Sequence, residues 1–389
     1  MQSYIKRKLH DKVEEYLNYF PAVALLGPRQ CGKSTLVKEL IKNINCSIFL
    51  DLERKSDLNK LTDPELYLST KSENLICLDE IQRLPDLFPV LRFLIDDNKK
   101  NGQFLILGSA SRDLLKQSTE TLAGRICYLE LTPFLLQEFD TGDKTTLYDL
   151  WVKGGFPKSI LSQSIKQSLL WRENFIKTFL ERDIRLTGFN VSTSTMYRLW
   201  KMVAHNHGQT INYSKLAASL GVSSPTVKLY VDILSETYML RLLPPLEVNI
   251  KKRLIKSPKV YIRDSGIFHS LMDIENFDDL FSHPGYGASW EGFCIENIIS
   301  SISDRWNASF YRTSSGKELD LILEKGQKRI AIEFKASRSP TVTKGFWSSL
   351  SDLNIKKAFI VAPVDELYPI TKDVYVSDLN SVINEINRM

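Results

Sequence analysis

The residues best suited to chemistry lie in the octapeptide Gly27-Pro28-Arg29-Gln30-Cys31-Gly32-Lys33-Ser34. It fits the pattern G-x-x-x-x-G-K-[ST], whose backbone N–H groups cradle the phosphates of a nucleotide. We expect Lys33 to reach the β- and γ-phosphates and the hydroxyl of Ser34 to bind Mg²⁺. The pattern therefore predicts an ATP site built from Gly27, Gly32, Lys33, Ser34 and Thr35.

Two acids form a second candidate group, at the end of the run Leu75-Ile76-Cys77-Leu78-Asp79-Glu80. Four apolar residues followed by two acids are typical of a buried strand that presents carboxylates at its carboxyl end. We expect Asp79 to hold Mg²⁺ through water and Glu80 to polarise the water that attacks ATP. The alternative is an acidic junction between a strand and a loop, with no catalytic role.

A third group is spread over two alternating runs, residues 317–325 and 328–335, which Gly326-Gln327 joins. A hairpin with this two-residue turn places Asp320 opposite Glu333. Facing carboxylates repel one another, and a protein tolerates them where a cation lies between them. The pattern therefore predicts a divalent-metal site of Asp320 and Glu333, with Lys335 on the same face to orient or deprotonate a water. Ordinary ion pairs on an exposed hairpin face are the alternative.

The elements that must position the first two groups alternate between apolar strands and helical stretches. Ala22-Val23-Ala24-Leu25-Leu26 precedes the phosphate loop, and a run with helical spacing follows it. Phe104-Leu105-Ile106-Leu107-Gly108-Ser109 is a further buried strand, and Ser109 or Ser111 is a candidate sensor of the γ-phosphate. The alternation predicts an α/β fold, with a parallel sheet and helices on both of its faces.

The middle of the chain is expected to be helical and to end in a basic hairpin. Residues 141–200 have the apolar spacing of helices and would form a lid. Residues 213–234 predict a helix, a glycine-containing turn and a second helix, and residues 240–263 would add a wing. The basic residues of this wing have no acid between them and favour contact with DNA phosphates: Lys251, Lys252, Arg253, Lys256, Lys259 and Arg263. A winged helix that serves only for packing is the alternative.

Six short runs, considered together, indicate a family: 27–35, Leu78-Asp79-Glu80-Ile81-Gln82, Gly108-Ser109-Ala110-Ser111, Leu122-Ala123-Gly124-Arg125, Gly154-Gly155-Phe156-Pro157 and Leu180-Glu181-Arg182-Asp183-Ile184. In this combination the chain resembles the AAA+-type ATPases of bacteria and archaea that end in a domain long catalogued as of unknown function. The resemblance implies an AAA+-like P-loop sheet. It also makes Arg125 a candidate arginine finger, which would reach the nucleotide of a neighbour in a homo-oligomer. A surface arginine or a salt bridge at the sheet edge is the alternative.

The third group fits the pattern D…E-x-K, and the helical run before it carries a further acid, Glu291. This arrangement resembles the PD-(D/E)XK nucleases, which include restriction enzymes and Holliday-junction resolvases. The resemblance implies a small α/β restriction-endonuclease-like domain in which Glu291 joins Asp320 and Glu333 at the metal. Leu319 stands where the name of the motif has proline. A degenerate fold that does not cleave is the alternative, because a fold does not guarantee its chemistry.

The chain of 389 residues is too long for one compact core. We expect a P-loop AAA+-type ATPase domain at residues 1–140, a helical lid at 141–200, a winged helix-turn-helix at 201–265 and a nuclease-like domain at 266–389. Five scattered cysteines without a C-x-x-C pair indicate reduced thiols and a cytoplasmic location. No apolar run approaches the roughly 20 residues of a membrane span. The net charge of +5 permits a nucleic-acid partner.

Taken together, these patterns predict a protein that binds and hydrolyses ATP with Mg²⁺ and couples this to a nuclease-like domain acting on branched or other DNA. The first rival is an ATP-switched assembly that binds DNA or protein through an inactive nuclease fold. The second is an ATPase that works as a motor or switch on a protein partner. Metal-dependent cleavage separates the first reading from its rivals, and salt-sensitive DNA binding separates both DNA readings from the last.

Overall fold

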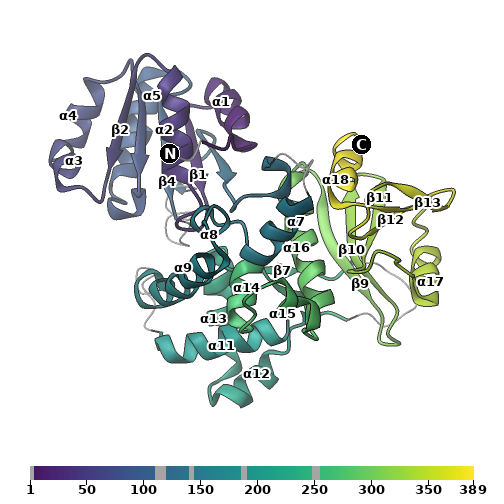
Figure 1. Ribbon diagram of the computed structural model, residues 1–389. Coiled ribbons are helices and arrows are strands. Elements are labelled where there is room, and N and C mark those ends of the chain that lie inside the picture. The colour runs from purple at the N-terminus through teal and green to yellow at the C-terminus, as the bar shows by residue number, and fades with distance from the viewer. Residues whose placement is uncertain (1–3, 110–119, 140–143, 185–190, 248–254) are drawn as a thin grey trace. The chain divides into compact units, whose positions relative to one another are not determined.

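The computed structural model describes residues 4–109, 120–139, 144–184, 191–247 and 255–389, and these form two compact units (Figure 1). The first unit comprises Met1–Phe134 with Glu236–Tyr238, and the second comprises Leu135–Ser235 with Met239–Met389. Within the described ranges, every helix is too short or too polar to cross a lipid bilayer. Ser111 and the basic residues Lys251, Lys252 and Arg253 lie outside these ranges.

The first unit is built on a five-stranded parallel sheet in the order β2-β3-β4-β1-β5. Its strands are β1 (Ala22–Leu26), β2 (Ser47–Asp51), β3 (Leu75–Asp79), β4 (Phe104–Gly108) and β5 (Ile126–Glu130). Every residue of β1, β3 and β4 is buried, which explains why their sequences are nearly unbroken apolar runs. The predicted parallel α/β fold is confirmed.

Helices surround this sheet in Figure 1: α1 (Leu9–Tyr19), α2 (Lys33–Leu40), α3 (Lys55–Lys60), α4 (Pro64–Ser69) and α5 (Leu87–Asn98), with the 3₁₀ turns η1 (Ile41–Asn43) and η2 (Ile81–Arg83). Because the strands are parallel, their carboxyl ends share one edge of the sheet. At that edge β1 leads into Gly27, β3 leads into Glu80 and β4 leads into Ser109. The topology therefore gathers the predicted nucleotide residues at one edge.

The second unit begins with helices: η3 (Leu136–Glu138), α7 (Lys144–Lys153), α8 (Pro157–Ile160), α9 (Ile165–Thr178) and the π-helical turn η4 (Phe179–Asp183). The end of α7 lies tightly against α14 (Ser265–Leu271). A Cβ atom on Gly154 would lie 2.2 Å from Oδ1 of Asp264, and Gly154 has a φ of +75°, which favours glycine. Asp264 also accepts a hydrogen bond of 2.8 Å from the N–H of Gly155. Packing thus explains the glycine at position 154, whereas the role of this region as a lid stays a prediction.

Two helices joined by a turn follow at the predicted residues, and their assignment as a winged helix-turn-helix stays a prediction. The elements of this region are α11 (Thr193–His205), α12 (Tyr213–Leu220) and α13 (Ser224–Glu236), with the antiparallel strands β6 (Gln209–Thr210), β7 (Leu240–Leu243) and β8 (Lys259–Ile262) in the order β6-β8-β7. Gly221 ends α12 in the left-handed conformation, with a φ of +68°. The hydroxyl of Ser223 accepts a 3.3 Å hydrogen bond from the N–H of Thr226 and so caps α13.

The chain ends in a mixed six-stranded sheet of the order β13-β14-β12-β11-β10-β9. In chain order its elements are α15 (Phe277–Ser282), α16 (Tyr286–Ser301), β9 (Asn307–Arg312), β10 (Glu318–Lys325), β11 (Lys328–Phe334), α17 (Lys344–Asp352), β12 (Lys357–Val361), β13 (Tyr368–Thr371), β14 (Val374–Ser377) and α18 (Leu379–Asn387). Strands β9, β10 and β11 are antiparallel, and β11, β12 and β14 are parallel.

The hairpin of β10 and β11 has the predicted turn and register. Gly326 has a φ of +60°, and the pairs run from Lys325 with Lys328 to Leu321 with Ile332. The ladder ends one pair short of Asp320 and Glu333. A register shift against β9 falls between Leu319 and Ile322, so the simple alternation of faces is interrupted at Asp320. As a result, the Asp320 carboxylate accepts a 3.1 Å hydrogen bond from the N–H of Phe334.

Candidate nucleotide site and carboxylate cluster

The phosphate loop connects β1 to α2 and requires its glycines. Gly27 has a φ of +154°, and a Cβ atom there would lie 2.1 Å from the carbonyl oxygen of Leu131. Gly32, with a φ of +102°, immediately precedes α2. Nζ of Lys33 donates to the carbonyl oxygens of Gly27 at 2.9 Å and Pro28 at 2.8 Å. The buried ammonium group therefore lies inside the loop, where it can contact a bound phosphate.

Ser34 and Asp79 meet beside this loop. Oγ of Ser34 donates a 2.6 Å hydrogen bond to Oδ2 of Asp79. Burial raises the pKa of Asp79, and the hydrogen bond from Ser34 opposes that shift. A hydroxyl and a carboxylate in contact provide two of the hard oxygen donors that Mg²⁺ prefers, so these residues fit the ion. Thr35, next on α2, is exposed.

Glu80 and Ser109 are joined by Gln82, to which the sequence analysis gave no role. Nε2 of Gln82 donates to Oε2 of Glu80 and, at 3.1 Å, to Oγ of Ser109. Glu80 itself has a left-handed backbone with a φ of +57°. Because β3 and β4 are neighbours in the sheet, the side chain of Gln82 can span their ends. Only the tertiary pairing of these strands shows that the three side chains form one chain of contacts.

Two arginines reach the same region. Nη2 of Arg29, in the phosphate loop, lies 3.8 Å from Oε2 of Glu80 and 3.4 Å from Oε1 of Glu53. Nη2 of Arg83 lies 3.0 Å from that same oxygen of Glu53. Glu53 thus links the phosphate loop to the segment after Glu80 through two positive charges.

Arg7 also contacts the phosphate loop, a role that its sequence position did not indicate. Its guanidinium is buried, with Nη1 donating to the carbonyl oxygen of Cys31 at 3.0 Å and Nη2 donating to that of Thr132 at 2.7 Å. The guanidinium also lies 4.4 Å from the ring centre of Phe134. The sequence signal was misleading, because Arg7 stands in the basic run Lys6-Arg7-Lys8, which is typical of a solvated surface.

Arg125 lies away from the nucleotide residues of its own chain. It directly precedes β5, and β5 runs parallel to β1, so Arg125 is at the amino edge of the sheet. The phosphate loop is at the carboxyl edge. The guanidinium of Arg125 forms a two-point contact with Asp96, with Nε at 2.6 Å from Oδ1 and Nη2 at 2.9 Å from Oδ2. Within one chain, Arg125 is thus held in an exposed ion pair.

In the second unit, Glu291 of α16 and Asp320 of β10 share a buried cation, Lys259 of β8. The Lys259 residue is 1% exposed, and its Nζ lies 2.9 Å from Oε1 of Glu291, 2.6 Å from Oε1 of Glu318 and 3.6 Å from Oδ1 of Asp320. Burial alone would lower the pKa of Lys259, but the carboxylates outweigh it and raise that pKa above its usual range. We name Glu291, Glu318, Asp320 and Glu333 the carboxylate cluster.

Glu333 has one carboxylate oxygen that is buried and makes no hydrogen bond to the described residues. Its Oε1 accepts a 2.7 Å hydrogen bond from Nζ of Lys335, and its Oε2 is buried without a hydrogen-bond partner among the described residues. Burial and the neighbouring Asp320 raise the pKa of Glu333 to about 8, against the opposing effect of Lys335. Burial raises the pKa of Glu291 to about 7, and Asp320 adds to that shift. The cluster is thus short of positive charge, which suits a further cation.

The predicted basic patch is wrong for two of its residues. Lys259 and Arg263 were expected to meet DNA phosphates, yet both are paired with buried acids. Nη2 of Arg263 lies 2.6 Å from Oε1 of Glu296 on α16, and Arg241 adds a two-point contact at 2.7 and 3.0 Å. A run of basic residues without a local acid reads as a solvated patch, because its acidic partners lie far away in the sequence. Of the described members, Lys256 is exposed.

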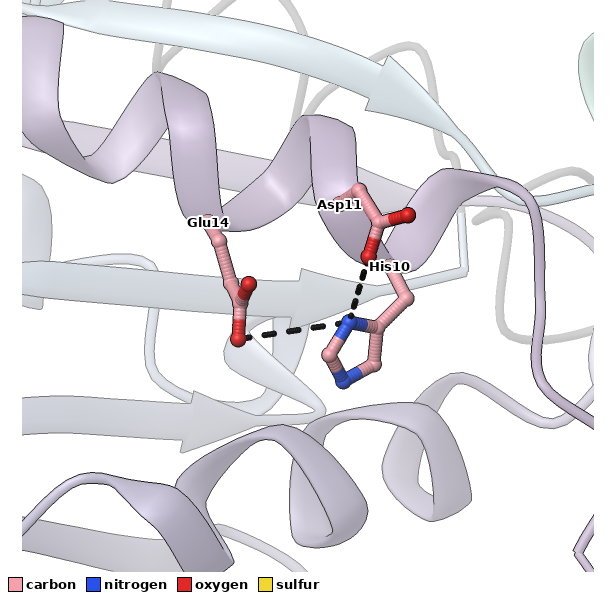
Figure 2. A group of neighbouring side chains, drawn as sticks. All are labelled: His10, Asp11 and Glu14. Carbon is pink, nitrogen blue, oxygen red and sulfur yellow. Dashed lines mark hydrogen bonds and ion pairs between the residues drawn. The ribbon is translucent and has the colours of Figure 1, made fainter.

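A separate group on α1, shown in Figure 2, brings His10, Asp11 and Glu14 together. Nδ1 of His10 lies 3.4 Å from Asp11 and 4.0 Å from Glu14. It is the only trio in the described ranges whose ligand atoms all lie within 4.8 Å of one another, so Glu291, Asp320 and Glu333 are less tightly gathered. Nζ of Lys6 already lies 2.6 Å from Oδ1 of Asp11, and we regard the group as a surface ion network.

Family comparisons match most of the chain in three parts. A profile described as an AAA domain matches residues 19–140, and two domains of unknown function, DUF8612 and DUF4143, match residues 144–278 and 286–382. Among curated proteins, the chain is similar to the uncharacterized proteins Rv2008c of Mycobacterium tuberculosis and Mb2031c of Mycobacterium bovis. Each is 38% identical over 379 residues, covering 97% of this chain and 84% of the relative.

Among solved structures, the chain is similar to the Walker-type ATPase PABY2304 of Pyrococcus abyssi. The TM-score is 0.51 at 16% sequence identity, and the match covers 69% of this chain and 96% of that one. At this identity the likeness concerns the fold. It agrees with the five-stranded parallel sheet and with the phosphate loop at its carboxyl edge.

Proposed function

This chain belongs to the same family as the mycobacterial proteins Rv2008c and Mb2031c and carries a P-loop ATPase domain, and on that premise we propose that ATP hydrolysis here controls a C-terminal nuclease-like domain that acts on DNA. The observation that carries the ATPase part is the joint placement of Lys33 inside the phosphate loop and of Ser34 against Asp79. The cytoplasm is the compartment where we expect it to work.

The residues of the nucleotide site have different roles in this proposal. The backbone of Gly27 to Gly32 and the ammonium of Lys33 bind the phosphates. Ser34 and Asp79 would hold Mg²⁺, which supplies positive charge against the phosphate oxygens. Glu80 orients and polarises the attacking water, and Ser109 donates to the γ-phosphate from the next strand end. The position of these residues at the shared strand edge supports each role.

Two variants test the ATPase. Lys33→Ala removes the cation that lies inside the loop, and ATP affinity, measured by calorimetry, should fall at least about tenfold. Glu80→Gln keeps the binding groups and removes the carboxylate, so ATP should still bind while turnover drops by about two orders of magnitude or more. Lys42→Ala, which removes an exposed lysine of η1 just after α2, is the matched control and should change neither quantity. Normal turnover in Glu80→Gln would remove Glu80 from the mechanism.

The nuclease-like part rests on the C-terminal sheet. Asp320 neighbours both Glu291 and Glu333, and Lys335 donates to Glu333, which supports the site that the resemblance to PD-(D/E)XK nucleases implies. Oε2 of Glu333, which has no hydrogen-bond partner in the described part of the chain, and its acidic neighbours fit a divalent ion held by Asp320, Glu333 and Glu291. The ion would supply Lewis acidity toward a phosphodiester, and Lys335 would orient or deprotonate the water.

DNA contact is proposed through the helix–turn–helix and the hairpin of β7 and β8. Lys228 on α13 and Lys256 beside β8 are exposed in this module, and the residues of the described part offer no base-reading arginine on α13. Contact with phosphates, without sequence preference, is therefore the form of binding we expect. Contact of Lys251, Lys252 and Arg253 with phosphates stays a prediction, because these residues lie outside the described ranges.

An inactive nuclease fold is the second candidate, and a specific observation favours it. Lys259 already places an ammonium group among three carboxylates, so the cluster is partly neutralised without any metal. In that case the chain would be an ATP-switched assembly that binds DNA or protein.

One experiment separates the two candidates: incubation of the full chain with branched, linear and single-stranded DNA, with and without Mg²⁺ and ATP. Cleavage that needs Mg²⁺ and disappears in Asp320→Ala and Lys335→Ala supports the nuclease. Salt-sensitive binding without cleavage supports the assembly. Lys328→Ala, at the distal turn of the hairpin, is the matched lysine control and should cleave as the wild type does.

A further inference from the structure

Gln82 occupies a position between the two polar groups at the ends of β3 and β4. Its Nε2 atom donates to Oε2 of Glu80 and to Oγ of Ser109, the latter at 3.1 Å. Because β3 and β4 are adjacent parallel strands, the two acceptors lie at the same edge of the sheet. One amide nitrogen thus joins the residue proposed to polarise the water to the residue proposed to contact the γ-phosphate.

The donor chemistry of this contact is saturated. A primary amide has two N–H groups, and the two bonds use both of them. The carbonyl oxygen of Gln82 is buried and has no hydrogen-bond partner among the described residues. Because the oxygen makes no hydrogen bond that could hold the amide, the two bonds made by the nitrogen set its orientation. They occupy one oxygen of Glu80 and leave the other to act on a water.

The backbone beside Gln82 is constrained as well. Glu80 has a φ of +57°, in the left-handed region that is unfavourable for residues other than glycine. The N–H of Arg83 donates a 2.9 Å hydrogen bond to the carbonyl oxygen of Glu80 and closes the turn. Such backbone conformations are held by surrounding contacts and concentrate at functional sites. The turn therefore presents Glu80 and Gln82 to the same edge of the sheet.

We propose that Gln82 is a positioning residue for ATP hydrolysis, which fixes the Glu80 carboxylate relative to Ser109 so that contact of Ser109 with the γ-phosphate aligns the attacking water. This inference rests on the proposed ATPase function and adds a residue to it. Gln82 forms and breaks no bond in the reaction. It acts through Glu80, and its loss leaves the phosphate-binding groups intact.

The test compares kcat with ATP affinity in the full chain. Gln82→Leu removes both donors, and kcat should fall about tenfold or more while KM and the ATP dissociation constant stay within about twofold. Gln82→Glu keeps the length of the side chain but replaces the donors with acceptors, so it should show the same loss. Since Gln82→Glu retains the shape and polarity of the side chain, it also tests the proposal if Gln82→Leu does not fold.

Two controls separate positioning from packing. Gln103, a buried amide just before β4, donates to the carbonyl oxygen of Lys100 and accepts from Asn98, so Gln103→Leu should lower the melting temperature without lowering kcat. In a Glu80→Gln background, Gln82→Leu should reduce kcat no further, because the group it positions is already gone.

The outcomes are distinct. A wild-type chain that neither binds nor hydrolyses ATP overturns the proposed ATPase and this inference together. A wild-type chain that hydrolyses ATP, with Gln82→Glu and Gln82→Leu equally fast, overturns the inference alone. A full additional loss of kcat when Gln82→Leu is added to Glu80→Gln also overturns it.

Discussion

Arg7 stabilises the phosphate loop from 24 residues ahead of Cys31 in the sequence. Its guanidinium binds the carbonyl oxygens of Cys31 and Thr132, so one buried cation ties the loop to the segment after β5. Carbonyl oxygens that face inward at this point would otherwise lack a donor, and an unsatisfied buried polar group is costly. The shape of the loop before nucleotide binds therefore depends on Arg7 as well as on its own glycines.

Replacing Arg7 with methionine keeps most of the apolar volume and removes the donors. We expect Arg7→Met to lower the free energy of unfolding of the first unit by roughly 2–3 kcal/mol and to weaken ATP binding, because the loop loses its support. Urea denaturation and calorimetry measure the two effects. Lys6→Met, one residue earlier at an exposed ion pair, is the control and should change both by little. Unaltered stability and affinity in Arg7→Met would contradict this account.

At the scale of elements, β7 and β8 of the helix–turn–helix module are joined to α16 and β10 by buried charges. Lys259 of β8 binds Glu291 and Glu318, while Arg263, just after β8, and Arg241 of β7 bind Glu296. Paired buried charges are costly to separate, because the remaining partner is left without a counter-charge. Within the second unit, these contacts fix the module against the C-terminal sheet.

The Glu296 cluster makes stability depend on pH. Burial would raise the pKa of Glu296, but Arg241 and Arg263 outweigh it and lower the pKa from 4.5 to about 2. The stabilisation is therefore complete above about pH 4.5 and is lost as the pH falls from there through about 2. Glu296→Gln should cost roughly 3 kcal/mol at pH 7, and its difference from the wild type should shrink on acidification.

Urea denaturation at pH 7 and at low pH measures this difference. Glu324→Gln, which breaks a half-exposed pair with Arg329, is the matched control and should cost less than about 1 kcal/mol at either pH. A difference between Glu296→Gln and the wild type that stays constant with pH would argue against the ion cluster.

Lys259 makes a second prediction at this scale. Lys259→Met leaves Glu291, Glu318 and Asp320 without their shared ammonium group, so the free energy of unfolding should fall by roughly 3–5 kcal/mol. Mn²⁺ or Mg²⁺ should restore more stability to this variant than to the wild type, since a divalent ion can take the vacated place. Melting temperatures with and without the ion measure the effect.

The partly exposed ion pair between Lys357 of β12 and Glu385 of α18 provides a control for that experiment. Lys357 lies 3.6 Å from Glu385, and Lys357→Met should shift the melting temperature little, with no added response to the ion. Equal responses of the wild type and Lys259→Met to Mn²⁺ would show that Lys259 does not occupy the place of a cation.

At the scale of the whole molecule, one sheet places the phosphate loop and Arg125 at opposite edges. The phosphate loop and Ser109 follow the carboxyl ends of their strands, and Asp79 is the last residue of β3, whereas Arg125 precedes the amino end of β5. Arg125 therefore lies at the edge of the sheet opposite to the nucleotide residues of its own chain. If it acts in hydrolysis, it acts on a neighbouring copy, which ties activity to assembly.

Mixing inactive variants tests the action of Arg125 in trans. Arg125→Ala and Glu80→Gln should each hydrolyse ATP slowly, and a mixture should regain part of the turnover, because the intact arginine of one chain serves the intact site of the other. Wild-type activity per chain should also rise with protein concentration. Arg92→Ala, an exposed arginine on α5, should stay active by itself. Full activity of a monomer at nanomolar concentration would end the proposal.

The sequence by itself determined the features that nearest neighbours control. The spacing of Gly27, Gly32 and Lys33, the apolar run that ends in Asp79 and the turn at Gly326 each act through local backbone geometry. Glycine tolerates a positive φ, and a two-residue turn sets the register of its hairpin. For that reason the phosphate loop, the parallel sheet and the pairing of β10 with β11 could be predicted.

The tertiary structure alone decided which charged groups meet. Lys259 looked like part of a basic surface, because Glu291 is 32 residues away in the sequence and the packing of β8 against α16 is invisible there. Arg7 and Gln82 likewise gained their roles only when β3, β4 and β5 came together. Whether a charge faces water or a buried counter-charge depends on burial, and burial is a property of the assembled fold.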